Sequence, residues 1–156
     1  MINLLALLRF EPLDDDTLAE EALHDYARRV QQSGGQVVDR EAEQLLVCLS
    51  DMRWGLQSLR NLLAQARRGG FTVRAAVVQA VLARTDPSHD QAAFTRRTLD
   101  TLLRLVARVD RQQVAITPKL LSLIQLSAPE YADLFESVDD PLPGEPRPQP
   151  VLVMVG

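Results

Sequence analysis

The sequence predicts an α+β protein with a β-α-β-β-α-β core, in which a mainly antiparallel sheet carries helices on one face. Three observations predict this class. Short apolar runs typical of strands alternate with longer segments whose apolar residues recur at helical spacing. Paired glycines at residues 34–35 and 69–70 follow the first two helical segments, where helices commonly end. The polar residues 40–43 separate two strand-like runs, which is typical of a hairpin.

The first half of the chain contains the two strand and helix units of this core. The run from Ile2 to Phe10 is almost continuously apolar, as expected for a strand buried on both faces. Aspartates at residues 14–16 favour a helix start, because negative side chains stabilise a helix N-terminus. Asp51 is the expected N-cap of the second helix. The expected elements are strands at 2–10, 36–39, 44–49 and 71–82, and helices at 15–32 and between Asp51 and Gly69.

The second half adds a C-terminal helix and strand to this ferredoxin-like core. The expected elements are a helix at about 90–108, a strand at 114–117, a short helix from Pro118 to Leu126, and strands at 134–138 and 151–155. The proline-rich residues 141–150 are interpreted as a connector to a last edge strand at 151–155. Residues 1–156 are therefore interpreted as one domain.

Composition excludes several classes of function. The net charge of −4 disfavours a nucleic-acid-binding protein, which usually carries a basic face. No apolar run approaches the length of about 18 residues that a transmembrane helix needs, so no membrane partner is expected. Cys48 is the only cysteine, so no internal disulfide forms, and a cytoplasmic location is expected.

Several segments resemble, in order, the strands of class III adenylate and guanylate cyclases. The first is Ser33-Gly34-Gly35-Gln36-Val37-Val38, which is similar to the "HGG-x-VV" segment that leads into the hairpin of that family. The later segments are Phe71-Thr72-Val73-Arg74, Val114-Ala115-Ile116-Thr117, Leu134-Phe135-Glu136-Ser137-Val138 and Pro150-Val151-Leu152-Val153. The resemblance covers nearly the whole chain and implies a nucleotide-cyclase-like fold.

The resemblance also implies where catalytic residues would lie. Such cyclases hold two Mg²⁺ ions on the nucleotide phosphates with two aspartates, one at the end of the first strand and one at the hairpin turn. The matching positions here are Glu11 and Glu43. Glutamate is one methylene longer than aspartate, and Mg²⁺ demands near-ideal octahedral geometry. Ala42 and Gln44 replace the two glycines of the turn, which let the backbone approach the phosphates.

The third helix of the family carries an asparagine and an arginine that stabilise the transition state. The resemblance places Asp100 at the asparagine position and Arg104 at the arginine position. Of these four family positions, only Arg104 keeps the family's residue type.

Because most of the motifs are altered, we expect a catalytically inactive, cyclase-like domain rather than an enzyme. It would act as a regulatory, dimerising or protein-interaction module in bacterial signalling. Glu11, Glu43, Asp100 and Arg104 would then be vestigial, with no catalytic residue, no metal and no cofactor. The resemblance implies a homodimer that shares its nucleotide site, and the candidate partners are a signalling protein and a nucleotide ligand.

Two alternatives remain open. In the first, the chain is a divergent nucleotidyl cyclase in which Glu11 and Glu43 hold Mg²⁺ or Mn²⁺ and Arg104 acts on the phosphates. In the second, the chain senses a nucleotide by binding it without turnover. Descent from diguanylate cyclases is a variant of the first, but residues 40–44 do not preserve their "GGDEF" hairpin.

Overall fold

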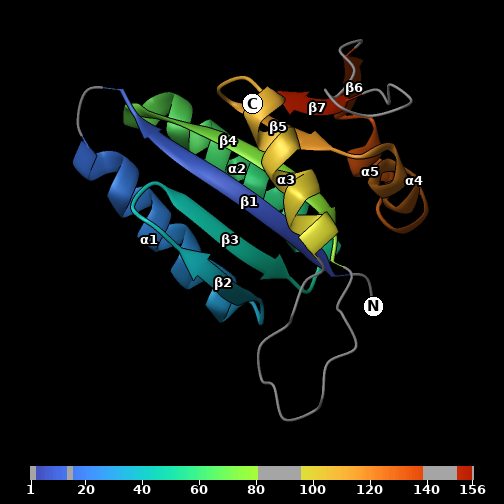
Figure 1. The fold of residues 1–156 in the computed structure, drawn as a ribbon, viewed down its shortest axis with the longest axis horizontal. Coiled ribbons are helices and arrows are strands. Elements are labelled where there is room, and N and C mark those ends of the chain that lie inside the picture. Colours follow the sequence, from blue (N-terminus) through green and yellow to red (C-terminus); the bar gives the residue numbers. More distant parts are fainter. Residues whose placement is uncertain (1–2, 14–15, 81–95, 139–150, 156) are drawn as a thin grey trace.

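The computed structural model describes residues 3–13, 16–80, 96–138 and 151–155 (Figure 1). The strands are β1 (Leu4–Pro12), β2 (Gln36–Arg40), β3 (Gln44–Leu49), β4 (Phe71–Gln79), β5 (Gln113–Ile116), β6 (Phe135–Val138) and β7 (Val151–Val155). The helices are α1 (Asp16–Gln32), α2 (Met52–Gly69), α3 (Arg96–Arg108), α4 (Pro118–Ser127) and α5 (Pro129–Ala132). Most bounds agree with the expected ones to within two residues, and α5 was not expected.

The described strands form one seven-stranded sheet in the order β2-β3-β1-β4-β5-β7-β6. Its first four strands have the ferredoxin-like order, and β1 pairs antiparallel with both β3 and β4. The pairing of β4 with β5 is parallel, whereas the other described pairs are antiparallel. The predicted α+β class and mainly antiparallel sheet are therefore confirmed.

The two faces of the sheet are covered by different helices. Alternate residues of β1, such as Leu4 and Leu8, share a buried cluster with residues of α1, α2 and α4. Leu5 and Leu7 point the other way and pack with Leu102 and other residues of α3. The core helices α1 and α2 thus share one face, as expected. The later helix α3 covers the opposite face, which the sequence did not indicate (Figure 1).

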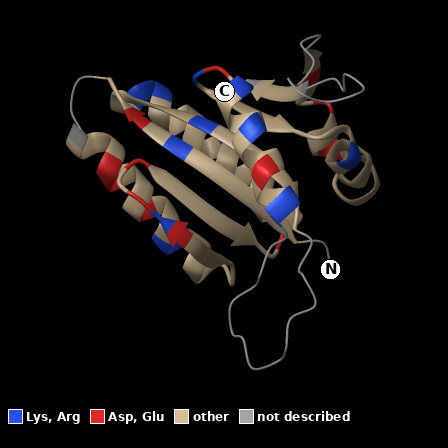
Figure 2. Ribbon diagram, viewed as in Figure 1, with Lys and Arg blue, Asp and Glu red and all other residues tan. Residues whose placement is uncertain are grey.

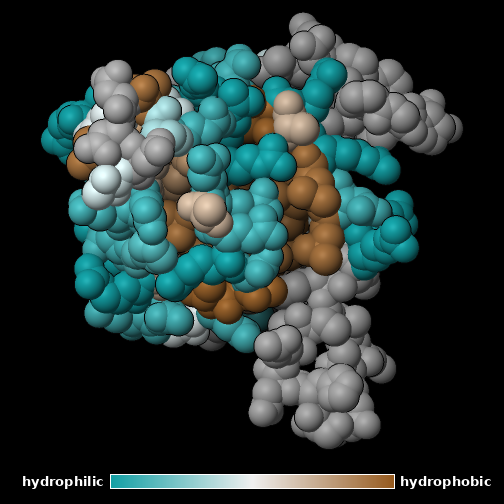
Figure 3. Space-filling model, turned by 60° about the vertical axis from the view of Figure 1, so that its left-hand side comes forward, coloured by the Kyte–Doolittle hydropathy of each residue, from teal (hydrophilic) through white to brown (hydrophobic). Residues whose placement is uncertain are grey.

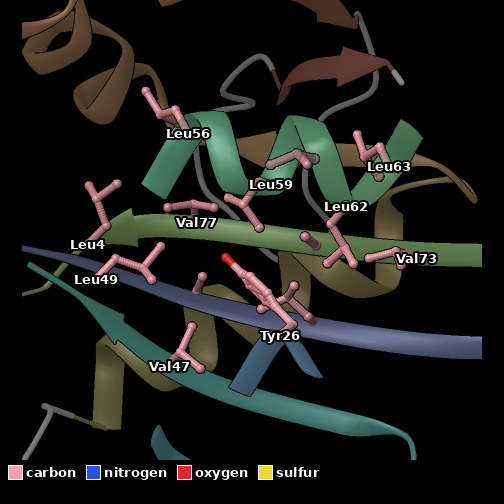
Figure 4. Close-up of a cluster of buried hydrophobic side chains, with 14 of the residues drawn as sticks. Leu4, Tyr26, Val47, Leu49, Leu56, Leu59, Leu62, Leu63, Val73 and Val77 are labelled. Atoms are coloured by element: carbon pink, nitrogen blue, oxygen red, sulfur yellow. The ribbon is translucent and has the colours of Figure 1, made fainter. Parts of the chain in front are cut away.

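The larger cluster fills the space between the sheet and the helices α1 and α2 (Figure 4). Leucines on one stripe of α2 face strand residues such as Val73 and Val77, and Tyr26 from α1 lies among them. Each fully buried leucine or valine contributes about 1.5–3 kcal/mol of transfer free energy, so this cluster stabilises the packing of α1 and α2 on the sheet.

Particular residues define the chain segments before β2 and at the two ends of α2. Gly34 has a φ of +91°, and a Cβ on Gly35 would lie 2.7 Å from the carbonyl oxygen of Cys48. Asp51 accepts a hydrogen bond from the backbone nitrogen of Trp54 and so caps α2, as predicted. Gly70 ends α2 in the left-handed conformation, with a φ of +78°.

The expectation that residues 151–155 form an edge strand is wrong. The strand β7 lies between β5 and β6, and β6 is the edge. The reason is that Leu152, Val153 and Met154 are successive buried residues, so both faces of β7 are covered. The connector at 141–150 and the first part of the expected third helix lie outside the described residues.

Within the described ranges, no helix is both long and apolar enough to span a bilayer. The surface in Figure 3 shows apolar patches among mostly hydrophilic side chains. The large apolar side chains that are exposed include Leu103 on α3, at 45%, and Leu126 on α4, at 83%.

Candidate functional site

Glu11 lies near the end of β1, on the face of the sheet that α3 covers. Side chains alternate along a strand, so Arg9 and Glu11 share the face of Leu5 and Leu7. Arg74 on β4 has the same orientation as Ala76, which packs under α3. The strand register therefore brings charged side chains from β1 and β4 together beside the C-terminal end of α3 (Figure 2).

The Glu11 carboxylate is held by two arginines. Its Oε1 lies 2.6 Å from Nε of Arg74, and its Oε2 lies 3.6 Å from Nε of Arg111. Arg74 also donates from an Nη atom to the carbonyl oxygen of Val109, just beyond α3, at 3.2 Å. Arg74 and Glu11 are both about three-quarters buried, so this ion pair ties β1 to β4 and α3.

The Nε–H of Arg74 is close to Glu11 but poorly aligned with it, so Nε is buried without a well-formed hydrogen bond. Thr72 lies opposite Glu11 in the strand register, and its hydroxyl oxygen is also buried with no partner in the structure. Arg9 donates from Nε to the side-chain oxygen of Gln44 at 3.1 Å. The end of β1 therefore gathers polar groups that are only partly satisfied.

Glu43 lies on the other side of the sheet end. Its backbone carbonyl accepts a hydrogen bond from the nitrogen of Phe10 at 2.8 Å. It lines a pocket of about 220 Å³ together with Phe10, Pro12 and Ala19. Phe10 and Ala19 belong to the larger buried cluster, on the face of the sheet that α1 and α2 cover. The two glutamates therefore come from neighbouring strand ends, but Glu11 faces the α3 side and Glu43 borders the α1 side. The structure does not bring them together as a pair.

The residues present do not fit a two-carboxylate metal site. Glu11 already has two cationic neighbours, and Glu43 borders a different face. In the described part of the chain, no group of three or more histidine, cysteine, aspartate or glutamate side chains could hold a metal ion. A hard cation such as Mg²⁺ needs converging oxygen ligands, which this arrangement does not supply.

Asp100 and Arg104 both lie on α3, and both are exposed. The helix buries Leu102, Leu105 and Val106 against the sheet, so Asp100 and Arg104 lie on its solvent side. They are four residues apart and therefore one turn from each other. Neither belongs to the cluster around Glu11, so the four sequence-predicted positions occupy three separate places.

A second hollow of about 540 Å³ lies between α1 and α2 and holds none of the predicted site residues. Leu18, Asp25, Gln65 and Phe71 are among its lining residues. Asp25 is paired with Arg28 and Arg29 of the same helix, so the charges here are already balanced.

Cys48 of β3 lies on the α3 face, opposite Leu5 of β1. It is half-buried, and burial raises the pKa of its thiol. A thiol with a raised pKa is a poor nucleophile at neutral pH, so no cysteine-based chemistry is indicated.

The residues that sequence reasoning missed are Arg74 and Arg111. Arg74 stands within the buried strand β4, between Val73 and Ala75. An arginine inside an apolar strand is the one sequence feature that could have identified it, because a buried charge needs a partner.

The fold is similar to solved structures of nucleotide cyclases. An adenylate cyclase from Trypanosoma brucei, in its monomeric state, matches with a TM-score of 0.74 at 14% identity, over 98% of this chain and 89% of that one. The guanylate cyclase domain of RhGC from Catenaria anguillulae, in complex with GTP, matches with a TM-score of 0.69 at 9% identity, over 99% and 96%.

A non-canonical dimeric guanylyl cyclase domain from Blastocladiella emersonii gives a TM-score of 0.66 at 10% identity, over 100% of this chain and 97% of that one. No family model matches the sequence, and no curated protein matches it. The chain therefore has the class III nucleotide cyclase-like fold, as the sequence resemblance implied.

These matches overturn the expectation that the chain is not an enzyme. Each of the three structures is named as an adenylate or guanylate cyclase. The expectation of inactivity rested on single residues at the family positions, whereas the structural matches cover nearly the whole chain.

Proposed function

We propose that the chain is a divergent nucleotidyl cyclase that converts ATP or GTP into a 3′,5′-cyclic nucleotide and pyrophosphate. The observation that carries this proposal is the extent of the match to cyclase domains. It spans 98–100% of this chain and 89–97% of the three cyclase structures. A chain that keeps every layer of a catalytic domain supports the same reaction class more strongly than a partial match would.

The reaction forms one bond and breaks one. The 3′-oxygen of the ribose bonds to the α-phosphorus, and the bond from that phosphorus to the bridging oxygen breaks. Pyrophosphate leaves with the electron pair, and the 3′-hydroxyl proton passes to solvent. Negative charge builds on the phosphate oxygens, so the protein must supply positive charge or N–H donors.

Arg104 is the proposed transition-state contact. It is exposed on α3, and its guanidinium carries five N–H donors that suit phosphate oxygens. Asp100 lies one turn earlier and receives no role here. In cyclases, divalent ions neutralise the phosphates, whereas Glu11 and Glu43 of this chain do not form a site for such ions.

We further propose that the active form is a homodimer. Arg104 lies away from the cluster around Glu11, so a site that uses both would draw on two copies of the chain. The Blastocladiella emersonii domain, described as dimeric, shows that a domain of this fold assembles in pairs.

The test is a turnover assay with the purified full-length chain. ATP and GTP are each incubated with Mg²⁺, Mn²⁺ or EDTA, and cyclic product is quantified by mass spectrometry. Cyclic product is expected, and Arg104→Ala should lower its rate by roughly 10²–10³-fold. Arg60→Ala, at an exposed position of α2 on the other side of the sheet, is the matched control and should retain the rate. If the chain binds ATP or GTP but forms no cyclic product with Mg²⁺, with Mn²⁺ or in EDTA, the proposal is contradicted.

A further inference from the structure

We propose that Arg9, Arg74 and Arg111, here called the arginine cluster, form a polyphosphate-binding site that works without a divalent metal ion. The inference deepens the proposed function, because the polyphosphate would be the triphosphate of the nucleotide. It starts from the disagreement above: the chain has the fold of a cyclase domain, yet the end of β1 holds arginines around a carboxylate instead of a pair of free carboxylates.

The three arginines converge from distant parts of the sequence. Arg74 on β4 and Arg111, after α3, contact opposite oxygens of Glu11. Arg9 lies two residues before Glu11 on the same face of β1, where it donates to Gln44. Arg9 is also the register partner of Arg74, so the three side chains start close together near the end of β1, with the guanidinium of Arg9 directed to Gln44.

Most N–H donors of the cluster make no hydrogen bond to another described residue. A guanidinium has five N–H donors, and a planar pair of them matches two phosphate oxygens. Arg9 makes one hydrogen bond, to Gln44, and Arg74 makes one, to the carbonyl of Val109. The 3.6 Å contact of Arg111 with Glu11 is too long for a hydrogen bond, and its side chain is 58% exposed.

One buried polar atom beside the cluster also lacks a partner among the described residues. The hydroxyl oxygen of Thr72 is buried without a hydrogen bond, whereas the Nε of Arg74 has Glu11 as an ion-pair partner at 2.6 Å. Unsatisfied buried polar groups are rare in folded proteins, and a bound ligand is one of their ordinary explanations. Thr72 lies directly opposite Glu11 in the register, so its hydroxyl is on the same face as the carboxylate that the arginines hold.

The local charge favours an anion even though the whole chain has a net charge of −4. The cluster carries three positive charges, against the negative charges of Glu11 and of Asp110, which is exposed next to Arg111. A triphosphate that binds here would compete with Glu11 for the same arginines. A cation at Glu11, in contrast, would have to displace Arg74, and Arg74 is fixed to both β1 and the end of α3.

The first test is a calorimetric titration of the full chain with inorganic tripolyphosphate in EDTA. Binding is expected in EDTA and should weaken as salt rises, because exposed charges are screened. Arg111→Gln should weaken binding about tenfold or more, since hydrogen bonds to charged groups are strong. Arg111 is mostly exposed, so this variant should fold, which circular dichroism checks. Arg60→Gln on α2 is the control and should bind as the wild type does.

The second test is Glu11→Gln, which separates the arginine site from a metal site. Removing the competing carboxylate should tighten tripolyphosphate binding in EDTA, and Mg²⁺ should bring no further gain. If Glu11 instead ligates a metal, the same variant should lose Mg²⁺-dependent binding. The inference is overturned by binding that requires Mg²⁺, by no binding in EDTA, or by an equal effect of Arg60→Gln.

The inference and the proposed function fail in different ways. Binding in EDTA without cyclic product would leave the arginine site standing and remove the cyclase activity. Cyclic product together with strictly Mg²⁺-dependent binding of tripolyphosphate would support the cyclase activity and rule out the metal-independent arginine site.

Discussion

Tyr26 carries a phenol hydroxyl into the core between α1 and α2. The side chain is 3% exposed, and its oxygen lies 2.9 Å from the hydroxyl oxygen of Ser58. Ser58 in turn donates to the carbonyl of Gly55, so the polar atoms form a short chain inside apolar packing. Burial raises the pKa of Tyr26 well above its usual value, and the hydrogen bond with Ser58 offsets only part of this effect.

This buried phenol should make the protein lose stability at high pH. The unfolded chain releases the tyrosine proton above a pH of about 10, whereas the folded state keeps it. The stabilisation that the protonated phenol gives the folded state is fully present below that pH. Above it, the free energy of unfolding should fall by up to about 1.4 kcal/mol per pH unit. Urea unfolding between pH 8 and 11 measures the slope.

The matched variants for this slope are Tyr26→Phe and Tyr131→Phe. Tyr26→Phe should cost about 1 kcal/mol at neutral pH through the lost hydrogen bond, and it should flatten the slope above pH 10. Tyr131→Phe removes a half-buried phenol that donates to Gln57 but leaves Tyr26 in place, so it should keep the slope. An unchanged slope in Tyr26→Phe would refute this explanation.

The candidate site shows what the sequence could and could not predict about single residues. The position of Glu11 at the end of the first strand was correct, because an apolar run that ends in a charge and a proline marks a strand end. Its partners could not be predicted. Arg74 and Arg111 are 63 and 100 residues away along the chain, and only the pairing of β1 with β4 and the end of α3 bring them close.

Elements were predictable wherever a local chemical cause defines them. The N-cap Asp51 and the terminal glycine Gly70 bound α2 in the sequence and in the structure alike. The strand β3 begins at Gln44 and ends at Leu49, as expected from the apolar run that follows the polar residues 40–43. Which face of the sheet α3 covers was not predictable, because an amphipathic helix shows only that it packs and not against what.

The cap of α2 gives a test at this scale. Asp51→Ala removes the acceptor for the Trp54 nitrogen and should lower the free energy of unfolding by roughly 0.5–2 kcal/mol. Asp51→Asn keeps an acceptor of the same shape and should cost much less. Chemical denaturation compares them, and equal losses for the two variants would show that charge, rather than capping, is what matters at this position.

At the scale of the whole molecule, the order of strands decides which residues meet. The order of elements in the sequence correctly predicted the ferredoxin-like order of the first four strands. It placed the last strand at the edge, whereas β7 is covered on both faces and lies inside the sheet. The order of the C-terminal strands depends on long-range packing, which no short motif encodes.

The proposed homodimer predicts a difference between two exposed leucines. Leu103 lies next to Arg104 on α3, whereas Leu126 lies on α4, which packs on the other face of the sheet. If two copies share Arg104, Leu103→Glu should shift the protein toward monomer in sedimentation equilibrium, because it places a charge in the interface. Leu126→Glu should leave the assembly unchanged. A wild-type chain that stays monomeric at high concentration would contradict the prediction.

We propose that this chain, which has the fold of a class III cyclase domain, performs the cyclase reaction. The most direct measurement is mass-spectrometric detection of cyclic nucleotide and pyrophosphate from ATP and from GTP, with Arg104→Ala run in parallel. We expect equal amounts of the two products from at least one nucleotide, and a rate that falls sharply in the variant. No cyclic product from either nucleotide with Mg²⁺, Mn²⁺ or EDTA, or an equal rate in Arg104→Ala, would contradict this proposal.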